Sequence, residues 1–169
     1  MNKDLKKYVV EGFIVVSVLG TVFHFVYDFL GQNFFIGFFF PVNESTWEHM
    51  KLLFFPMLFY SLYMNHKLKT DYPCITSSLL FGILLGTVLV PVLFFTYSGI
   101  LGKNFLPLDI ATFVISVILA FFAVYKLTLS CKVISYKSLL RLLVFIVAVC
   151  FLIFTYHPLA VGIFEVPTP

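Results

Sequence analysis

The sequence predicts an all-α protein, a polytopic bundle of transmembrane helices that forms one domain over residues 1–169. Hydrophobic residues make up 61% of the chain and its mean hydropathy is +1.04. Charged residues make up only 11%, whereas a soluble domain carries about 25%. Apolar runs of about 18 residues or more, long enough for a helix to cross the hydrocarbon core, recur along the chain. The short alternating segments of a membrane β-barrel do not occur in it.

These apolar runs predict about five membrane spans, separated by short polar or glycine-containing connections. The spans are predicted at residues 8–30, 45–64, 75–97, 108–125 and 139–156. A further apolar stretch, residues 34–42, is too short to cross, so we expect it to be re-entrant or to lie at the interface.

Short sequence patterns predict further features of the second and third spans. Ser45 followed by Glu48 has the spacing of a capping box and predicts the start of the second span. Gly82 and Gly86 are four residues apart in the third span, which predicts a small-residue face for close helix packing. Pro91 in the same span predicts a kink.

The distribution of basic residues predicts how the chain is oriented in the plasma membrane. Nearly all lysines and arginines precede the first span, follow the second, or lie between the fourth span and the first turn of the fifth; the exceptions are Lys51 and Lys103. The positive-inside rule therefore predicts a cytoplasmic N-terminus and an external C-terminus. This arrangement suits contact with membrane lipids and is not the footprint of a nucleic-acid-binding protein.

The three cysteines, Cys74, Cys131 and Cys150, are far apart in the sequence. Their spacing indicates neither a disulfide framework nor a zinc site. We expect them to be small packing residues.

Polar and ionisable side chains gather at the predicted outer end of every span. Ionisable groups at this depth are costly and commonly mark a binding or catalytic site, although helix ends are also where polar residues ordinarily occur. The gathered residues are His24, Asp28, Glu44, Glu48, His49, Tyr97, Asp109 and His157.

The histidines among these residues predict a metal site. His24, His49 and His157 are the candidate ligands, for Zn²⁺ or another divalent metal. His24 lies inside an apolar helix where no capping role exists, and Asp28, four residues on, shares its helical face. We expect Asp28 to orient the His24 imidazole; the alternative is a buried His–Asp pair that only fixes helix packing.

The carboxylates Asp28, Glu44 and Glu48 are the catalytic candidates. Each glutamate also has a simpler interpretation, since Glu48 completes the capping box and Glu44 complements the helix dipole. Glu48 and His49 point about 100° apart on a helix, so only one can face inward, and we expect it to be His49.

Other polar residues near the outer ends of the predicted spans also have two interpretations. Trp47 and Tyr97 are candidate substrate-binding residues, although Trp47 also suits an interfacial anchor. Lys51 is three residues after Glu48, so a local ion pair is its simplest role. Asp109, at a helix start after Pro107, is expected to complement the helix dipole.

Three functions fit this constellation. A metal with an open coordination position could activate water and hydrolyse a lipid-like or cell-envelope substrate. Alternatively, the bundle binds or transports a small solute or lipid, or it is a structural membrane protein without catalysis. The sequence contains no HExxH, Walker, Ser-x-x-Lys or Gly-x-Ser-x-Gly motif, so it does not decide whether the chain is an enzyme.

The stretch "PVNESTWEHMKLLFFP" resembles the signature P-V-N-E-S-x-W-E-H-x-K-L of an uncharacterised family of small bacterial integral membrane proteins. "LGTVFHFVYDFLG", "GILLGTVLVPVLFFTYSGILGKN" and "IFTYHP" are similar to that family too. The resemblance implies a membrane location but no activity. It also implies a shared role for His24, Glu44, Trp47, Glu48, His49 and Lys51. A fainter likeness links the motif to the alkaline ceramidase and progestin/adipoQ receptor group of metal-dependent membrane hydrolases, which have seven spans and more ligating histidines.

Overall fold

The computed structural model describes residues 2–167, and these residues form helices and no strand. This confirms the predicted all-α bundle. The helices are α1 (Asn2–Phe29), α2 (Phe34–Gly37), α3 (Thr46–Leu68), α4 (Ile75–Leu101), α5 (Leu106–Ser130) and α6 (Lys137–Phe154), with 3₁₀ turns η1 (Ile134–Tyr136) and η2 (Gly162–Phe164).

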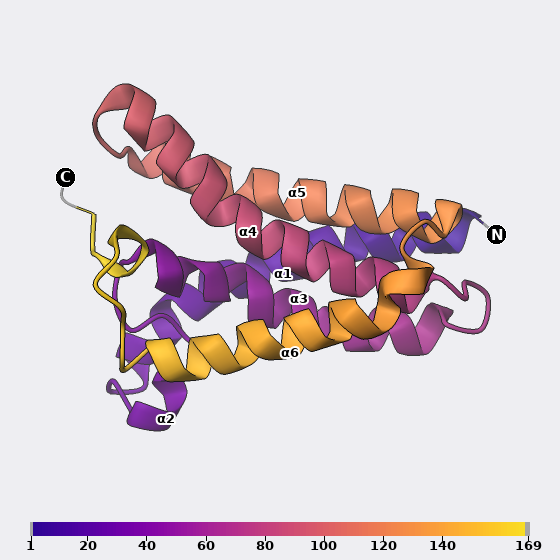
Figure 1. Cartoon of the computed structure of the whole chain (residues 1–169), viewed down its shortest axis with the longest axis horizontal. Coiled ribbons are helices and arrows are strands. Elements are labelled where there is room, and N and C mark those ends of the chain that lie inside the picture. The colour runs from indigo at the N-terminus through magenta and orange to yellow at the C-terminus, as the bar shows by residue number, and fades with distance from the viewer. Residues whose placement is uncertain (1, 168–169) are drawn as a thin grey trace.

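The five long helices lie side by side, and successive ones run in opposite directions (Figure 1). The N-terminus, the α3–α4 connection and the α5–α6 connection lie at one end, which we call the lysine-rich end because it carries most of the basic residues. The opposite end holds α2, the α4–α5 connection and residues 155–167 (Figure 1). We call it the α2 end.

Four helices, α1, α4, α5 and α6, are long and apolar enough to cross a membrane, so the chain is a membrane protein. The remaining long helix, α3, is less apolar, but it packs against both α1 and α4 and buries residues along most of its length. Its buried polar side chains contact protein and need not face lipid; they are Thr46, Glu48, Lys51 and Ser61. The prediction of a fifth span at α3 stays a prediction.

Close packing at glycines holds α4 against its neighbours. A Cβ on Gly82 would lie 2.5 Å from Val124 Cγ2, and one on Gly86 would lie 2.8 Å from Leu53 Cδ2. Both distances are shorter than real Cβ contacts. The predicted small-residue face is confirmed, and it packs against both α3 and α5.

The start of α3 forms only half of the predicted capping box. The Ser45 hydroxyl accepts a hydrogen bond from the Glu48 backbone N–H at 3.4 Å. The Ser45 N–H donates to Asn43 Oδ1 at 2.9 Å, while the Glu48 carboxylate accepts from the Val42 N–H at 2.9 Å. Glu48 therefore fixes the loop before α3 instead of closing the box.

Glu48 and Lys51 form a fully enclosed ion pair at the α2 end. The Lys51 ammonium donates three hydrogen bonds, to Glu48 Oε2 at 2.7 Å, Gly37 O at 2.9 Å and Thr155 Oγ1 at 2.6 Å. The side chains of Lys51 and Glu48 are 0% and 2% exposed. This pair confirms the predicted local contact, and it also joins α3 to α2 and to the end of α6.

Cys74 and Cys131 form a disulfide at the lysine-rich end, so the expectation that all three cysteines are packing residues is wrong for this pair. Cys74 precedes α4 and Cys131 follows α5. Because α4 and α5 are antiparallel, their ends meet although the cysteines are 57 residues apart. Cys150 is free.

Removing one member of the buried ion pair should destabilise the protein strongly. Replacement of Lys51 by Met leaves the Glu48 carboxylate buried without its counter-ion, which typically costs about 3–5 kcal/mol. We expect the double variant E48Q/K51M to be more stable than K51M alone, because it buries no unpaired charge. Unfolding of each variant in detergent measures the difference. Equal stability of K51M and the wild type would contradict this account.

Candidate functional site

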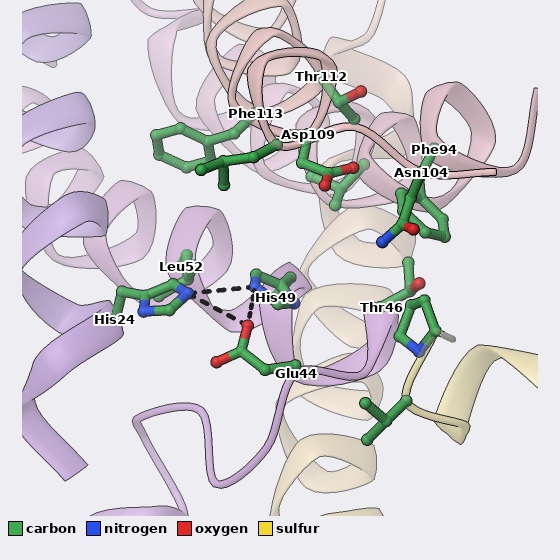
Figure 2. A pocket seen from close by; sticks show the side chains of 14 residues that line it. His24, Glu44, Thr46, His49, Leu52, Phe94, Asn104, Asp109, Thr112 and Phe113 are labelled. Carbon is green, nitrogen blue, oxygen red and sulfur yellow. Dashed lines mark hydrogen bonds and ion pairs between the residues drawn. The ribbon is translucent and has the colours of Figure 1, made fainter. Parts of the chain in front are cut away.

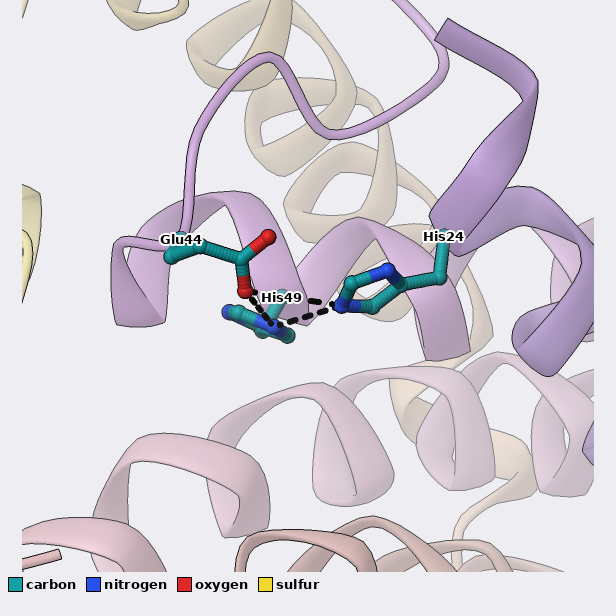
Figure 3. A group of neighbouring side chains, drawn as sticks. All are labelled: His24, Glu44 and His49. Carbon is teal, nitrogen blue, oxygen red and sulfur yellow. Dashed lines mark hydrogen bonds and ion pairs between the residues drawn. The ribbon is translucent and has the colours of Figure 1, made fainter. Parts of the chain in front are cut away.

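Three ligand-type side chains converge at the α2 end. His24 comes from α1, Glu44 from the loop before α3, and His49 from the first turn of α3 (Figure 3). The Nε2 atoms of His24 and His49 are 3.3 Å apart. Glu44 Oε2 lies 3.5 Å from His24 Nε2 and 3.3 Å from His49 Nε2. We call these three residues the triad.

A backbone carbonyl fixes the orientation of the His49 ring. His49 Nδ1 lies 2.9 Å from the Ser45 carbonyl oxygen, which can only accept, so we assign the ring proton to Nδ1. In the neutral imidazole, Nε2 then carries a lone pair and faces a carboxylate oxygen that also only accepts. A cation between them, or protonation of His49, resolves this repulsion.

The spacing of the triad matches one face of a zinc tetrahedron. Zn²⁺ binds histidine nitrogen and carboxylate oxygen at about 2.0–2.1 Å, so two ligand atoms of a regular tetrahedron are about 3.3–3.4 Å apart. The observed separations are 3.3, 3.3 and 3.5 Å. The triad thus has the residue types and the spacing of ligand atoms that a three-ligand zinc site requires.

Glu44 is the most exposed of the three, with 64% of its side chain accessible. A hydrogen bond from His49, which its Nε2 donates when the ring is protonated, lowers the pKa of the Glu44 carboxyl below its usual value. Glu44 is therefore ionised at neutral pH, the state that coordinates a metal.

The triad forms one wall of a cavity of about 350 Å³ (Figure 2), a volume within the range of small-molecule sites. Polar groups from α3, the α4–α5 connection and α5 continue the wall, and apolar side chains from α3, α4 and α5 complete it. The residues that line the cavity are His24, Glu44, Thr46, His49, Leu52, Val90, Phe94, Asn104, Leu106, Asp109, Thr112, Phe113, Val166 and Pro167.

Gly20 explains how α1 brings His24 close enough to His49. A Cβ on Gly20 would lie 2.6 Å from the Leu52 carbonyl oxygen and 2.5 Å from the Phe113 ring. Gly20 is one turn from His24, and Leu52 is one turn from His49, so the helices touch next to the triad. Only glycine permits this approach without displacing backbone.

The structure gives two of the predicted carboxylates other partners. Asp28 is exposed and accepts a hydrogen bond from Gln32 Nε2 at 2.9 Å, so the expected pairing with His24 is wrong, and His24 contacts His49 and Glu44 instead. Glu48 is enclosed with Lys51 and does not line the cavity. Of the catalytic candidates, Glu44 alone joins the histidines.

The other residues predicted for the site, Trp47, Tyr97 and His157, lie outside the triad. Trp47 packs among Phe151, Phe154 and Phe164 and does not line the cavity. Tyr97 lies behind the cavity wall, where its hydroxyl donates to Asp109 Oδ1. His157 is exposed beyond the end of α6 and does not belong to the triad.

The sequence interpretation missed the contribution of the C-terminal segment. We expected residues 157–169 to be an external tail, yet Val166 and Pro167 line the cavity, while positions 168 and 169 fall outside the described residues. The Phe164 ring packs on Trp47, with centroids 4.8 Å apart, and holds this segment in place. Because only a tertiary aromatic contact positions it, no local pattern signalled its role.

Comparison with known proteins places the chain in one family. Family DUF6512, a family of unknown function, matches residues 1–167, and the chain belongs to it. This confirms the expectation of an uncharacterised family. No curated protein and no solved structure matches the chain.

Replacing Gly20 by Ala should disrupt the triad by pushing α1 away from α3. We expect metal affinity to fall by about 10- to 100-fold, the typical effect of altering the support of a metal ligand. Gly99→Ala is the matched control, because Gly99 lies in α4 and a Cβ there meets nothing within 4 Å. Competition with a chromophoric zinc chelator measures both variants. Unchanged affinity in G20A would contradict the role of this contact.

Proposed function

We propose that the protein is a metal-dependent membrane hydrolase that binds Zn²⁺ or a similar divalent ion at His24, Glu44 and His49. The observation that carries the proposal is the placement of three ligand atoms at tetrahedral spacing on the wall of a cavity. An ion bound there keeps a coordination position for water, whose pKa a catalytic zinc lowers to about 7. The metal would also polarise a carbonyl or phosphoryl group of the substrate.

The charges around the cavity support a bound cation. Over residues 2–167, its lining includes the carboxylates Glu44 and Asp109 and no lysine or arginine. Lys51, the nearest lysine in sequence to His49, is enclosed with Glu48 elsewhere. A divalent ion balances the two carboxylates, since both histidines bind it in their neutral form.

The composition of the cavity supports an amphipathic substrate. Its polar residues include Asn104 and Glu44, which lie in connections at the α2 end, whereas Val90 lies about 16 Å along α4 from Leu101. A ligand that fits this gradient has a polar head and an apolar group, as lipid-like and cell-envelope substrates do. The same gradient favours the alternative function, binding or transport of such a molecule without turnover.

We propose that the α2 end faces outward, with the N-terminus in the cytoplasm. The basic residues at the lysine-rich end support this orientation under the positive-inside rule. The disulfide joins the two connections at that end and weighs against this orientation, since disulfides persist mainly outside the cytoplasm, but basic residues occur near both connections and also before the first span. Labelling of a cysteine introduced at Gly99 by a membrane-impermeant reagent in intact cells tests the orientation, and protection of this position would overturn it.

Metal analysis of the purified protein tests the site directly. We expect about one equivalent of zinc in protein purified without chelator, and loss of most of it in H24A, H49A and E44Q, because each removes a ligand. His66→Ala is the matched control, since His66 is exposed near the other end of α3. Wild-type protein without stoichiometric transition metal would end the hydrolase proposal. Metal that survives all three substitutions would show that the ion binds elsewhere.

A further inference from the structure

Asp109 is an acidic group of the cavity that the triad does not use. It lies in the first turn of α5, across the cavity from His24, Glu44 and His49 (Figure 2). It is not a member of the group whose ligand atoms lie within 4.8 Å of one another. Asp109 therefore reaches a metal in the triad only through an intervening molecule.

Asp109 lies in the first turn of α5, the position that complements the helix dipole, but its side chain does not cap the helix. The N-cap of α5 is Phe105, and no side chain caps this helix. Instead, Asp109 Oδ1 accepts a hydrogen bond from the Tyr97 hydroxyl, and the Tyr97 oxygen in turn accepts from the Phe105 N–H at 3.4 Å. Tyr97 thus ties the carboxylate and the start of α5 to α4, and it leaves Asp109 Oδ2 for another partner.

Among the described residues, no lysine or arginine lines the cavity to pair with this second oxygen. With both histidines holding the metal, water on that metal is the proton donor that the proposed function supplies. We propose that Asp109 is the proton acceptor for this water and that Tyr97 is its positioning residue. This inference rests on the proposed metal site.

The step balances without any further reactant. With the ion held by His24, Glu44 and His49, a water on it would give one proton to Asp109 Oδ2, and the oxygen of that water would form a bond to the carbonyl carbon of the substrate. The bond from that carbon to the leaving oxygen or nitrogen would then break, and the leaving atom would take the proton back from Asp109. One water is consumed, and an acid and an alcohol or amine are released.

Binding of azide to the cobalt-loaded protein tests the geometry without a known substrate. Azide occupies the open coordination position and changes the visible spectrum of Co²⁺. If Asp109 faces that position, its charge opposes the anion, so we expect D109N to bind azide about tenfold more tightly than the wild type. Y97F should give an intermediate shift, because it releases the carboxylate without removing its charge.

Asp28→Asn is the matched charge control, since Asp28 pairs with Gln32 outside the cavity and its removal should leave azide affinity unchanged. Equal azide affinity of D109N and wild type, with cobalt bound in both, overturns the inference. Loss of cobalt from D109N also overturns it, because Asp109 would then be a ligand. Wild-type protein that binds no cobalt overturns the proposed metal site instead.

Hydrolysis of p-nitrophenyl butyrate by zinc-loaded protein in detergent is the second readout. We expect D109N to retain zinc and to lose about 100-fold in kcat, the lower range for removal of a general base. Y97F should lower kcat by less, with little change in KM. D109N that hydrolyses the ester at the wild-type rate overturns the inference. If zinc-loaded wild-type protein does not hydrolyse the ester, the result contradicts the proposed hydrolase function. The azide experiment then decides whether Asp109 faces the open coordination position.

Discussion

The enclosed ion pair between Glu48 and Lys51 is the interaction on which the α2 end depends. Each charge is satisfied inside the protein: the ammonium reaches Gly37 O and Thr155 Oγ1, and the carboxylate accepts from the Val42 N–H. A charge buried in a membrane protein without such partners would be strongly unfavourable. The pair therefore forms only when α2, the start of α3 and the end of α6 are assembled together.

This pair also determines what the neighbouring residues can do. Glu48 and His49 are consecutive on α3, so turning Glu48 toward Lys51 directs His49 about 100° away, toward α1 and the cavity. The segment that leads into Glu44 is held at two points, through Gly37 O and the Val42 N–H. The Glu48–Lys51 ion pair and the candidate metal-site residue His49 thus lie on different faces of the same part of α3.

The all-α fold, the small-residue face and the local Glu48–Lys51 contact could be predicted from the sequence, because each follows from hydropathy or helical spacing. The sequence also predicted that His24, Glu44 and His49 lie at one end of the bundle, because their positions in the predicted spans place them at the same depth in the membrane. The pairing of Asp28 could not be predicted, because His24 and Gln32 are each four residues from it in the sequence. The disulfide depends on how α4 and α5 pair, and the place of Val166 depends on a tertiary contact, so neither had a local signal.

Lipid gives little hydrophobic drive for one helix to associate with another, so close packing and buried polar contacts must specify the bundle. In this protein, close packing and a buried polar contact both occur near the cavity. Gly20 allows α1 to pack closely on α3, and the Glu48–Lys51 ion pair fixes the first turns of α3. The candidate ligands are placed by the same contacts that assemble the helices. Ligand substitutions such as H49A leave those contacts intact, whereas G20A and K51M remove them. Loss of metal with an unchanged unfolding transition therefore distinguishes a metal ligand from a residue that builds the site.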